Sequence, residues 1–93
     1  MINPPPLDFT KVEKLRKQML LTTGDMSTLL GISRMTYYGW VRGKPIRNSN
    51  DARVRRTLKQ LLFILCEHNW PTPDVIAMSQ KDRFAKLQAL TTP

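Results

Sequence analysis

The sequence predicts an all-α fold, a compact bundle of five or six helices in a single domain. Signals for β-structure are scarce, since the chain has no Asn-Gly or Asp-Gly hairpin turn and no long alternation of apolar and polar residues. Apolar residues instead recur at intervals of three and four, in segments bounded by capping residues, glycine and proline. A chain of 93 residues has the size of one domain with a modest core.

The chain opens with a proline-rich segment, residues 1–9, that we expect to form an extended arm, and the domain is assigned to residues 10–93. Thr10 and Glu13 have the spacing of a capping box and predict a first helix over about 10–20. Its apolar face holds Val12, Leu15 and Met19. Its basic residues are expected to face solvent: Lys11, Lys14, Arg16 and Lys17.

A second helix can begin after Thr22 or Thr23, either of which is a suitable cap. Asp25 lies in its first turn, where the helix dipole favours a negative charge. Gly31 can adopt the left-handed conformation that ends this helix. The apolar face of the helix holds Met26, Leu29 and Leu30.

The third helix follows after only three residues, with Ser33 as its predicted cap, and it runs to about Arg42. Two short helices joined by so tight a glycine-containing turn are a helix-turn-helix arrangement. Tyr37 and Trp40 share one face, and we expect them in the core rather than as stacking platforms. The groups left facing outward near the helix start are Arg34, Met35, Tyr38 and the backbone of Gly39.

The second half of the chain predicts one long helix over about 51–68, capped by Ser49 or Asn50, and two shorter ones. The apolar stripe of the long helix holds Val54, Leu58, Leu61, Leu62 and Leu65. The end of that helix is apolar nearly all round, which indicates burial on more than one side. A short helix is expected from Thr72-Pro73 to about Met78. A last helix follows Ser79 to about residue 90, with an apolar face of Phe84, Leu87 and Leu90.

Charge divides the chain into a basic front and a neutral back. Residues 1–59 hold twelve Lys or Arg and four Asp or Glu, a net charge of +8, whereas residues 60–93 hold three of each, a net charge of zero. Such an imbalance suggests a polyanionic partner, with nucleic acid favoured over an anionic membrane or a merely solvated basic surface. The basic run Arg53, Arg55, Arg56 and Lys59 either flanks this partner or forms a solvated face.

The sequence gives little support for an enzyme, a metal-binding protein, a membrane protein or a secreted protein. Cys66 and His68 lack the second pair of ligands that a metal site needs, and no glycine-rich phosphate loop is present, so we expect no enzyme, no metal and no cofactor. No apolar run approaches the roughly 18 residues of a membrane span. The first residues do not have the pattern of a signal peptide. A single cysteine suits a reducing compartment, and we expect a cytoplasmic protein, in the bacterial cytosol or associated with the nucleoid.

Residues 21–44, LTTGDMSTLLGISRMTYYGWVRGK, resemble the lambda-repressor-like helix-turn-helix family, of the Cro and xenobiotic-response-element type. The similarity rests on Leu21-Thr22, small Ser27, the run from Leu30 to Arg34, and Arg42-Gly43-Lys44, all at the family's spacing without gaps. It implies sequence-specific binding of double-stranded DNA by a small transcriptional regulator, such as a repressor, of phage or mobile-element type. No small-molecule ligand is expected.

The resemblance also implies roles for individual residues. Base contacts would come from Arg34, Met35 and Tyr38. Phosphate contacts would come from Thr23, Ser33, Thr36, Arg42, Lys44 and Arg47. Arg34 is the strongest candidate for reading a guanine. Gly39 departs from the family, because it stands where a base-reading side chain is often found.

Small readers of this kind usually pair, so we expect a homodimer in which the C-terminal helices, about 51–90, provide the contact. The residues assigned to this interface are Leu62, Phe63, Leu65, Trp70, Phe84 and Leu87. Two alternatives use the same shape: a DNA-packaging adaptor similar to a phage small terminase subunit, and a protein-interaction module that has lost DNA binding.

Overall fold

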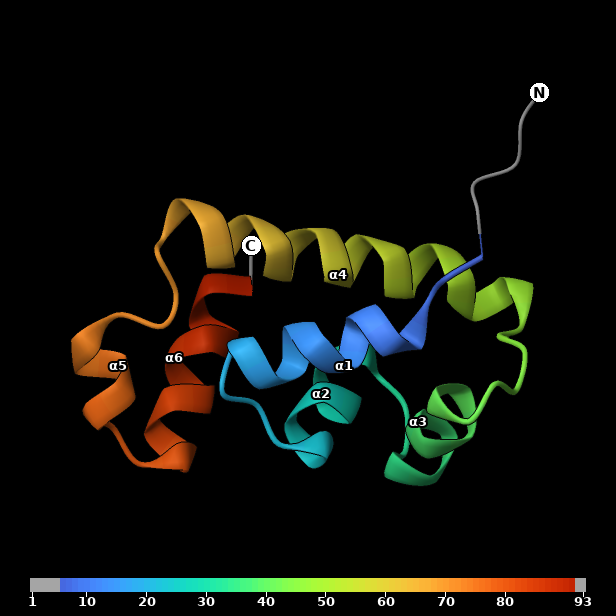
Figure 1. The fold of residues 1–93 in the computed structure, drawn as a ribbon, viewed down its shortest axis with the longest axis horizontal. Helices are drawn as coiled ribbons and strands as arrows, with labels where there is room; N and C mark the ends of the chain where they lie inside the picture. Colours follow the sequence, from blue (N-terminus) through green and yellow to red (C-terminus); the bar gives the residue numbers. More distant parts are fainter. Residues whose placement is uncertain (1–5, 92–93) are drawn as a thin grey trace.

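Residues 6–91 are described in the computed structural model, and they form six α-helices without a strand (Figure 1). The helices in chain order are α1 (Phe9–Gln18), α2 (Thr23–Leu30), α3 (Arg34–Val41), α4 (Asn48–Glu67), α5 (Pro73–Ala77) and α6 (Gln80–Thr91). The all-α prediction, with a helix-turn-helix pair inside the bundle, is therefore confirmed. Most of the expected N-terminal arm, residues 1–5, lies outside the described part of the chain.

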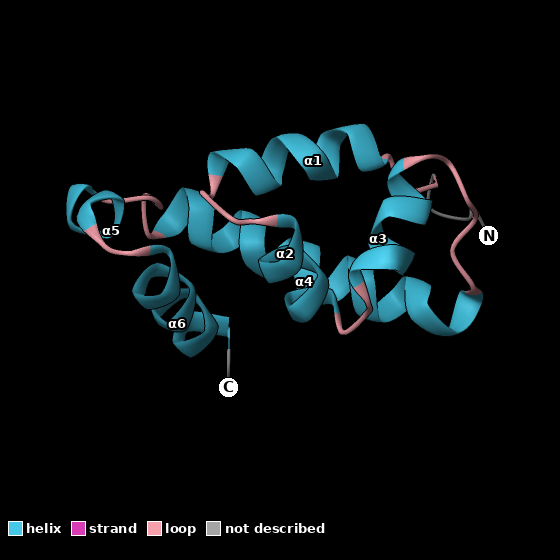
Figure 2. Cartoon of the chain, turned by 90° about the horizontal axis from the view of Figure 1, so that it is seen from below, coloured by secondary structure: helices cyan, strands magenta, loops and turns pink. Residues whose placement is uncertain are grey.

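The long helix α4 runs along one whole edge of the molecule, and the other helices lie beneath it (Figure 1). α1, α2 and α3 occupy the region under its first part, whereas α5 and α6 lie under its second part. Seen from below, α2 and α3 lie in front of α4 (Figure 2). Direct packing joins α2 to α3 and α4, α1 to α3, and α4 to α6. The outer face of α4 and the α2–α3 pair therefore lie on opposite sides of the bundle.

Aromatic side chains fill the core between α1 and α3. Tyr37 and Trp40 are buried, as their spacing predicts. Phe9 contacts both, with ring centroids 6.1 Å from Tyr37 and 5.6 Å from Trp40. The assignment of Phe9 to an extended arm is therefore wrong, because its ring completes this cluster and it is the first residue of α1.

Two predicted helix starts differ in the structure. α1 is capped by Asp8, whose carboxylate accepts a hydrogen bond of 2.9 Å from the Thr10 backbone N–H, and not by a box of Thr10 and Glu13. α4 begins at Asn48, so the two predicted caps, Ser49 and Asn50, lie within its first turn. Backbone geometry alone starts this helix, since the cap residue Arg47 makes no side-chain capping bond.

The predicted ends of the helix-turn-helix pair are confirmed. Thr22 and Asp25 form a reciprocal capping box at the start of α2, with both hydrogen bonds at 3.0 Å. Gly31 ends α2 in the left-handed conformation, with φ of 71° and ψ of 34°. The Ser33 hydroxyl accepts the Thr36 backbone N–H at 3.1 Å and so caps α3.

Buried side chains from the C-terminal part of the chain, including Trp70, Val75 and Leu87, belong to the common core. Trp70 is 3% exposed, and its indole N–H donates to the Met19 carbonyl at 2.9 Å. Leu87 of α6 is fully buried. The assignment of Trp70 and Leu87 to an intermolecular interface is therefore wrong, because both are core residues of the single chain.

The other assigned interface residues remain at least partly accessible. Leu62 and Phe63 are 48% and 60% exposed, while Leu65 and Phe84 are partly buried. Leu62 and Leu65 thus lie beside the buried stripe of α4, which continues through Ile64. None of the helices in residues 6–91 has both the length and the hydrophobicity needed to cross a bilayer.

Candidate nucleic-acid interface

The residues assigned to DNA come together on the α2–α3 side of the bundle and in the segment that follows α3. All of them are exposed except Thr23, which is partly buried at the first position of α2. Met35 is the most accessible large apolar side chain of the bundle at 83%, which suits an apolar contact with an external surface. The exposed members of this set are Ser33, Arg34, Met35, Thr36, Tyr38, Arg42, Lys44 and Arg47.

Arg34 is the first residue of α3, and its side chain extends across the start of α2. A Cβ atom built on Gly24 would lie 3.6 Å from the Arg34 Cδ, so the small residue at position 24 leaves room for this extended path. Arg34 has no hydrogen bond or ion pair with any other residue in the described part of the chain. Its guanidinium donors therefore remain available to an external acceptor.

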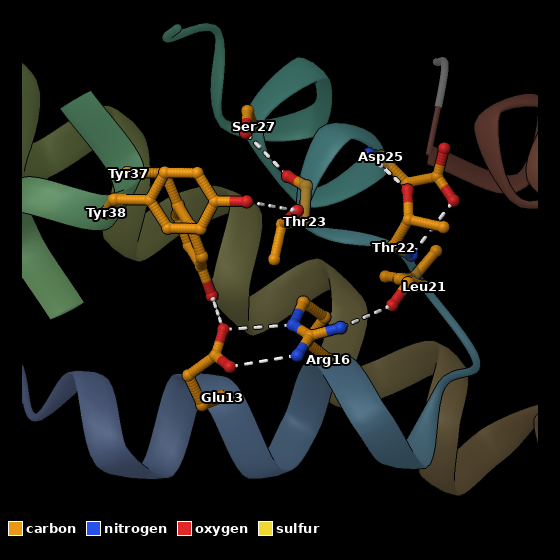
Figure 3. Close-up of polar contacts among 9 residues, drawn as sticks. All are labelled: Glu13, Arg16, Leu21, Thr22, Thr23, Asp25, Ser27, Tyr37 and Tyr38. Carbon is orange, nitrogen blue, oxygen red and sulfur yellow. Dashed lines mark hydrogen bonds and ion pairs between the residues drawn. The ribbon is translucent and has the colours of Figure 1, made fainter. Parts of the chain in front are cut away.

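Two pairs of hydroxyl groups lie beside Arg34. The Thr23 and Tyr38 hydroxyls share a hydrogen bond of 3.0 Å that joins the start of α2 to the middle of α3 (Figure 3). The Ser33 hydroxyl donates to the Thr36 hydroxyl at 2.9 Å. Each pair uses one of its two protons internally, so one proton per pair can be donated to a phosphate oxygen.

A partly buried polar network fixes α3 against α1. The Tyr37 hydroxyl donates to Glu13 Oε1 at 2.6 Å, and Arg16 binds both oxygens of that carboxylate at 2.9 Å (Figure 3). Arg16 also donates to the Leu21 carbonyl at 2.9 Å, so it holds the segment that leads into α2. The same three side chains therefore orient both helices of the pair.

The protonation of these groups follows from the contacts. Hydrogen bonding from Arg16 lowers the pKa of the Glu13 carboxyl. The hydrogen bond to Glu13 raises the pKa of Arg16. Burial, assisted by the same carboxylate, raises the pKa of the Tyr37 phenol. The network therefore holds a carboxylate, a guanidinium cation and a neutral phenol at physiological pH.

Sequence reasoning missed the roles of Glu13 and Arg16, which it assigned to a helix cap and to solvent. Their separation of three residues is the spacing of an intrahelical ion pair, and this signal could have indicated their mutual contact. The third partner, Tyr37, lies 24 residues from Glu13, and no local pattern predicts that contact.

The expectation that Gly39 faces outward is wrong. Gly39 is buried, because the aliphatic chain of Lys44 lies over it, and a Cβ atom at Gly39 would be 3.1 Å from the Lys44 Cδ. The Lys44 backbone N–H also donates to the Gly39 carbonyl at 2.9 Å, which closes the turn after α3. Because Gly39 has no side chain, the aliphatic part of Lys44 can pack against its backbone, and the Lys44 ammonium lies near the end of α3.

The four basic residues Arg53, Arg55, Arg56 and Lys59 of α4 lie in different environments. The Arg53 guanidinium lies over Gly31, within 3.6–3.8 Å of where a Cβ atom would be, and donates to the Asn50 amide oxygen at 3.0 Å. Arg55 forms an ion pair of 3.0 Å with Asp51. Arg53 thus adds positive charge beside the turn of the helix-turn-helix pair, whereas Arg56 and Lys59 are exposed further along α4.

Cys66 and His68 are exposed near the end of α4. Within residues 6–91, no three His, Cys, Asp or Glu side chains are grouped so that they could hold a metal ion. A comparison with protein-family models, curated proteins and solved structures found no match for this chain.

Proposed function

We propose that this protein binds double-stranded DNA sequence-specifically through the α2–α3 face and acts as a small transcriptional regulator of the lambda-repressor-like type. The observation that carries the proposal is the contrast between Tyr37 and Arg34 on α3. Tyr37 is held by the partly buried network with Glu13 and Arg16, whereas Arg34, at the exposed start of the helix, has no hydrogen bond or ion pair within residues 6–91. A helix fixed in this way can place a bidentate donor at base edges in the major groove.

The groups around Arg34 suit the phosphates on either side of the groove. The hydroxyl pairs Thr23–Tyr38 and Ser33–Thr36 each have one proton to donate. Three cations follow α3 in the chain: Arg42, Lys44 and Arg47. Phosphate contacts of this kind fix the orientation of a protein on the duplex, whereas base contacts give sequence preference.

Charge supports the same partner. The net charge of +8 falls entirely within residues 1–59, which include the whole helix-turn-helix pair. Each phosphate neutralised by a cation releases counterions, so affinity would fall steeply as salt concentration rises. We infer a cytosolic location for such a protein, where a single free cysteine such as Cys66 stays reduced.

Selection of bound sequences from random duplex DNA tests this proposal. We expect a short enriched motif that contains a guanine, and we expect Arg34→Ala to lose about 1–3 kcal/mol of discrimination at that base pair. Lys81→Ala is the matched control, because Lys81 is an exposed cation at the start of α6. Enrichment of no motif, together with equal affinities of the wild type and Arg34→Ala at all salt concentrations, would contradict the proposal.

A further inference from the structure

The outer face of α4 carries a large apolar side chain where the helix is otherwise polar. Phe63 lies on the side of α4 away from the buried stripe of Val54, Leu58 and Leu61, and it is 60% exposed. At helical spacing, its neighbours on this face are all exposed: Arg56, Lys59, Gln60, Cys66 and Glu67. Phe63 is therefore the one large apolar side chain that this part of the outer face of α4 presents to solvent.

A groove lies beside this phenylalanine. It has a volume of about 400 Å³, and it is formed by the outer side of α4 and the end of α6. Its walls include Phe63 itself, Ile64, His68 and Leu90, and the last of these is 39% exposed. Arg56, Lys59 and Gln60 also line this groove, so its walls are of mixed polarity. A second copy of the same face would cover the exposed ring and the groove together.

The charges on this face determine which partner fits. Lys59 lies four residues before Phe63 and Glu67 lies four residues after it, and neither forms an ion pair within residues 6–91. In a two-fold pair of antiparallel α4 helices that cross at Phe63, Lys59 of each copy comes near Glu67 of the other. In a parallel pair, each of these charges would meet its own like charge.

The wider charge distribution along α4 favours the same direction. The first part of the helix, residues 48–59, holds four Arg or Lys and one Asp, a net charge of +3, whereas residues 60–67 hold a single Glu, a net charge of −1. In an antiparallel pair that crosses at Phe63, only residues 59–67 of the two α4 helices overlap, so the basic part of each helix extends past the end of the partner's α4 and does not face its own copy. A parallel pair would oppose two strongly basic segments, which costs association energy.

We propose that two copies of this chain pair through the outer face of α4, antiparallel, with Phe63 at the two-fold axis, so that one dimer holds two separate DNA duplexes. The joining of two duplexes rests on the proposed DNA binding. The α2–α3 pair lies on the side of the bundle opposite the outer face of α4 (Figures 1 and 2). A two-fold axis within the interface therefore turns the two α2–α3 faces in opposite directions, away from a shared duplex.

Sedimentation velocity without DNA tests the pairing. We expect the wild type to dimerise, and Phe63→Ala to weaken dimerisation about tenfold or more. Lys59→Glu and Glu67→Lys should each weaken it about tenfold, and the double variant should restore it, because each swap alone opposes like charges. Lys81→Glu is the control for the change in net charge. A monomer at several hundred micromolar, or a dimer that the two single swaps leave unchanged, would overturn the pairing.

Energy transfer between two differently labelled duplexes tests whether one dimer holds two duplexes. Duplexes that carry a donor or an acceptor should come together when the wild-type protein is added, and Phe63→Ala should bind each duplex without joining them. A dimer that binds DNA but gives no energy transfer would overturn the bridging arrangement. A dimer with no DNA affinity at all would overturn the proposed function, and bridging with it, but leave the α4 pairing intact.

Discussion

α3 and α6 both lie beneath α4, at opposite ends of the molecule, but different interactions hold them (Figure 1). α3 is fixed by a partly buried carboxylate that binds a phenol and a guanidinium, all within 2.9 Å. The α5–α6 end is fixed by the buried side chains Trp70 and Leu87. The helix expected to read DNA is thus oriented by an ion pair and a phenol hydrogen bond in addition to packing, whereas the other end combines buried side chains with hydrogen bonds to uncharged groups.

Several hydrogen bonds at the C-terminal end reach backbone carbonyls. Arg83 donates to the carbonyls of Val75, Ile76 and Met78 at 2.9–3.0 Å, so it caps the end of α5. Gln80 donates to the Leu20 carbonyl at 2.9 Å and also to the Asp25 carboxylate at 2.7 Å.

The largest expected effect is on the packed end. Trp70→Ala removes a buried indole and leaves the Met19 carbonyl without its donor, so we expect a loss of about 3–5 kcal/mol in the free energy of unfolding. Urea unfolding followed by circular dichroism measures this loss. Phe63→Ala in dilute protein is the control, because this exposed ring should change stability by only about 0.5 kcal/mol. Similar effects of the two variants would mean that Trp70 is not part of the core.

A smaller effect is expected at the polar end. Glu13→Ala removes the acceptor of the buried Tyr37 hydroxyl and the partner of Arg16, which should cost about 1–3 kcal/mol of stability. Because α3 is then less well oriented, DNA affinity measured at a temperature where the variant is folded should also fall. Glu67→Ala, at the chain's other glutamate, should leave the DNA affinity of the dilute protein unchanged. A Glu13→Ala variant with normal stability would refute the role of this network.

The polar end should also respond to pH. The pKa of Glu13 is lower in the folded protein than its ordinary value of 4.5, so its contribution to stability is present above that pH. That contribution is lost as the pH falls through the lower, folded pKa. Unfolding free energies measured between neutral pH and acid should decline less in Glu13→Gln than in the wild type. Parallel declines in the two proteins would assign acid sensitivity to other carboxylates.

The smallest effect is expected from Gly39→Ala. Alanine should raise helix propensity by about 1 kcal/mol, but its Cβ displaces the flexible Lys44 chain, so stability should change by about 1 kcal/mol or less. DNA affinity should nevertheless fall, since the Lys44 ammonium is displaced from the end of α3. Gly43→Ala is the contrasting variant, because its φ of 103° is a strained conformation for alanine, and it should destabilise the fold. Unaltered DNA affinity in Gly39→Ala would exclude the role of Gly39 in placing Lys44.

The helix boundaries in the first half of the chain differ in how well the sequence predicted them. A cap at Thr22 or Thr23, the left-handed Gly31 and the Ser33 cap were predictable because each depends on residues within one turn. The structure selects Thr22, which forms a reciprocal box with Asp25. The start of α1 was not, because Thr10–Glu13 and Asp8 both offered acceptable caps locally. Tertiary contacts decided between them, since Glu13 binds Arg16 and Tyr37 instead.

The candidate site shows the same limit. Spacing placed Arg34, Met35 and Tyr38 outward and Tyr37 inward, as in the structure. It could not show that Lys44 covers Gly39, because that contact depends on how the chain turns after α3. Nor could apolar periodicity distinguish Trp70 and Leu87, which pack within the chain, from Phe63, which does not. Amphipathic patterns identify apolar faces but do not identify what covers them.

We propose that the fixed α3 presents Arg34 to DNA. Fluorescence anisotropy with a selected duplex and its single-base variants, at several salt concentrations, tests it most directly. We predict an affinity that falls with salt for every protein, a loss of discrimination at one guanine in Arg34→Ala, and unchanged discrimination in Lys81→Ala. Equal discrimination by the wild type and Arg34→Ala, or an affinity that does not depend on salt, would contradict the claim.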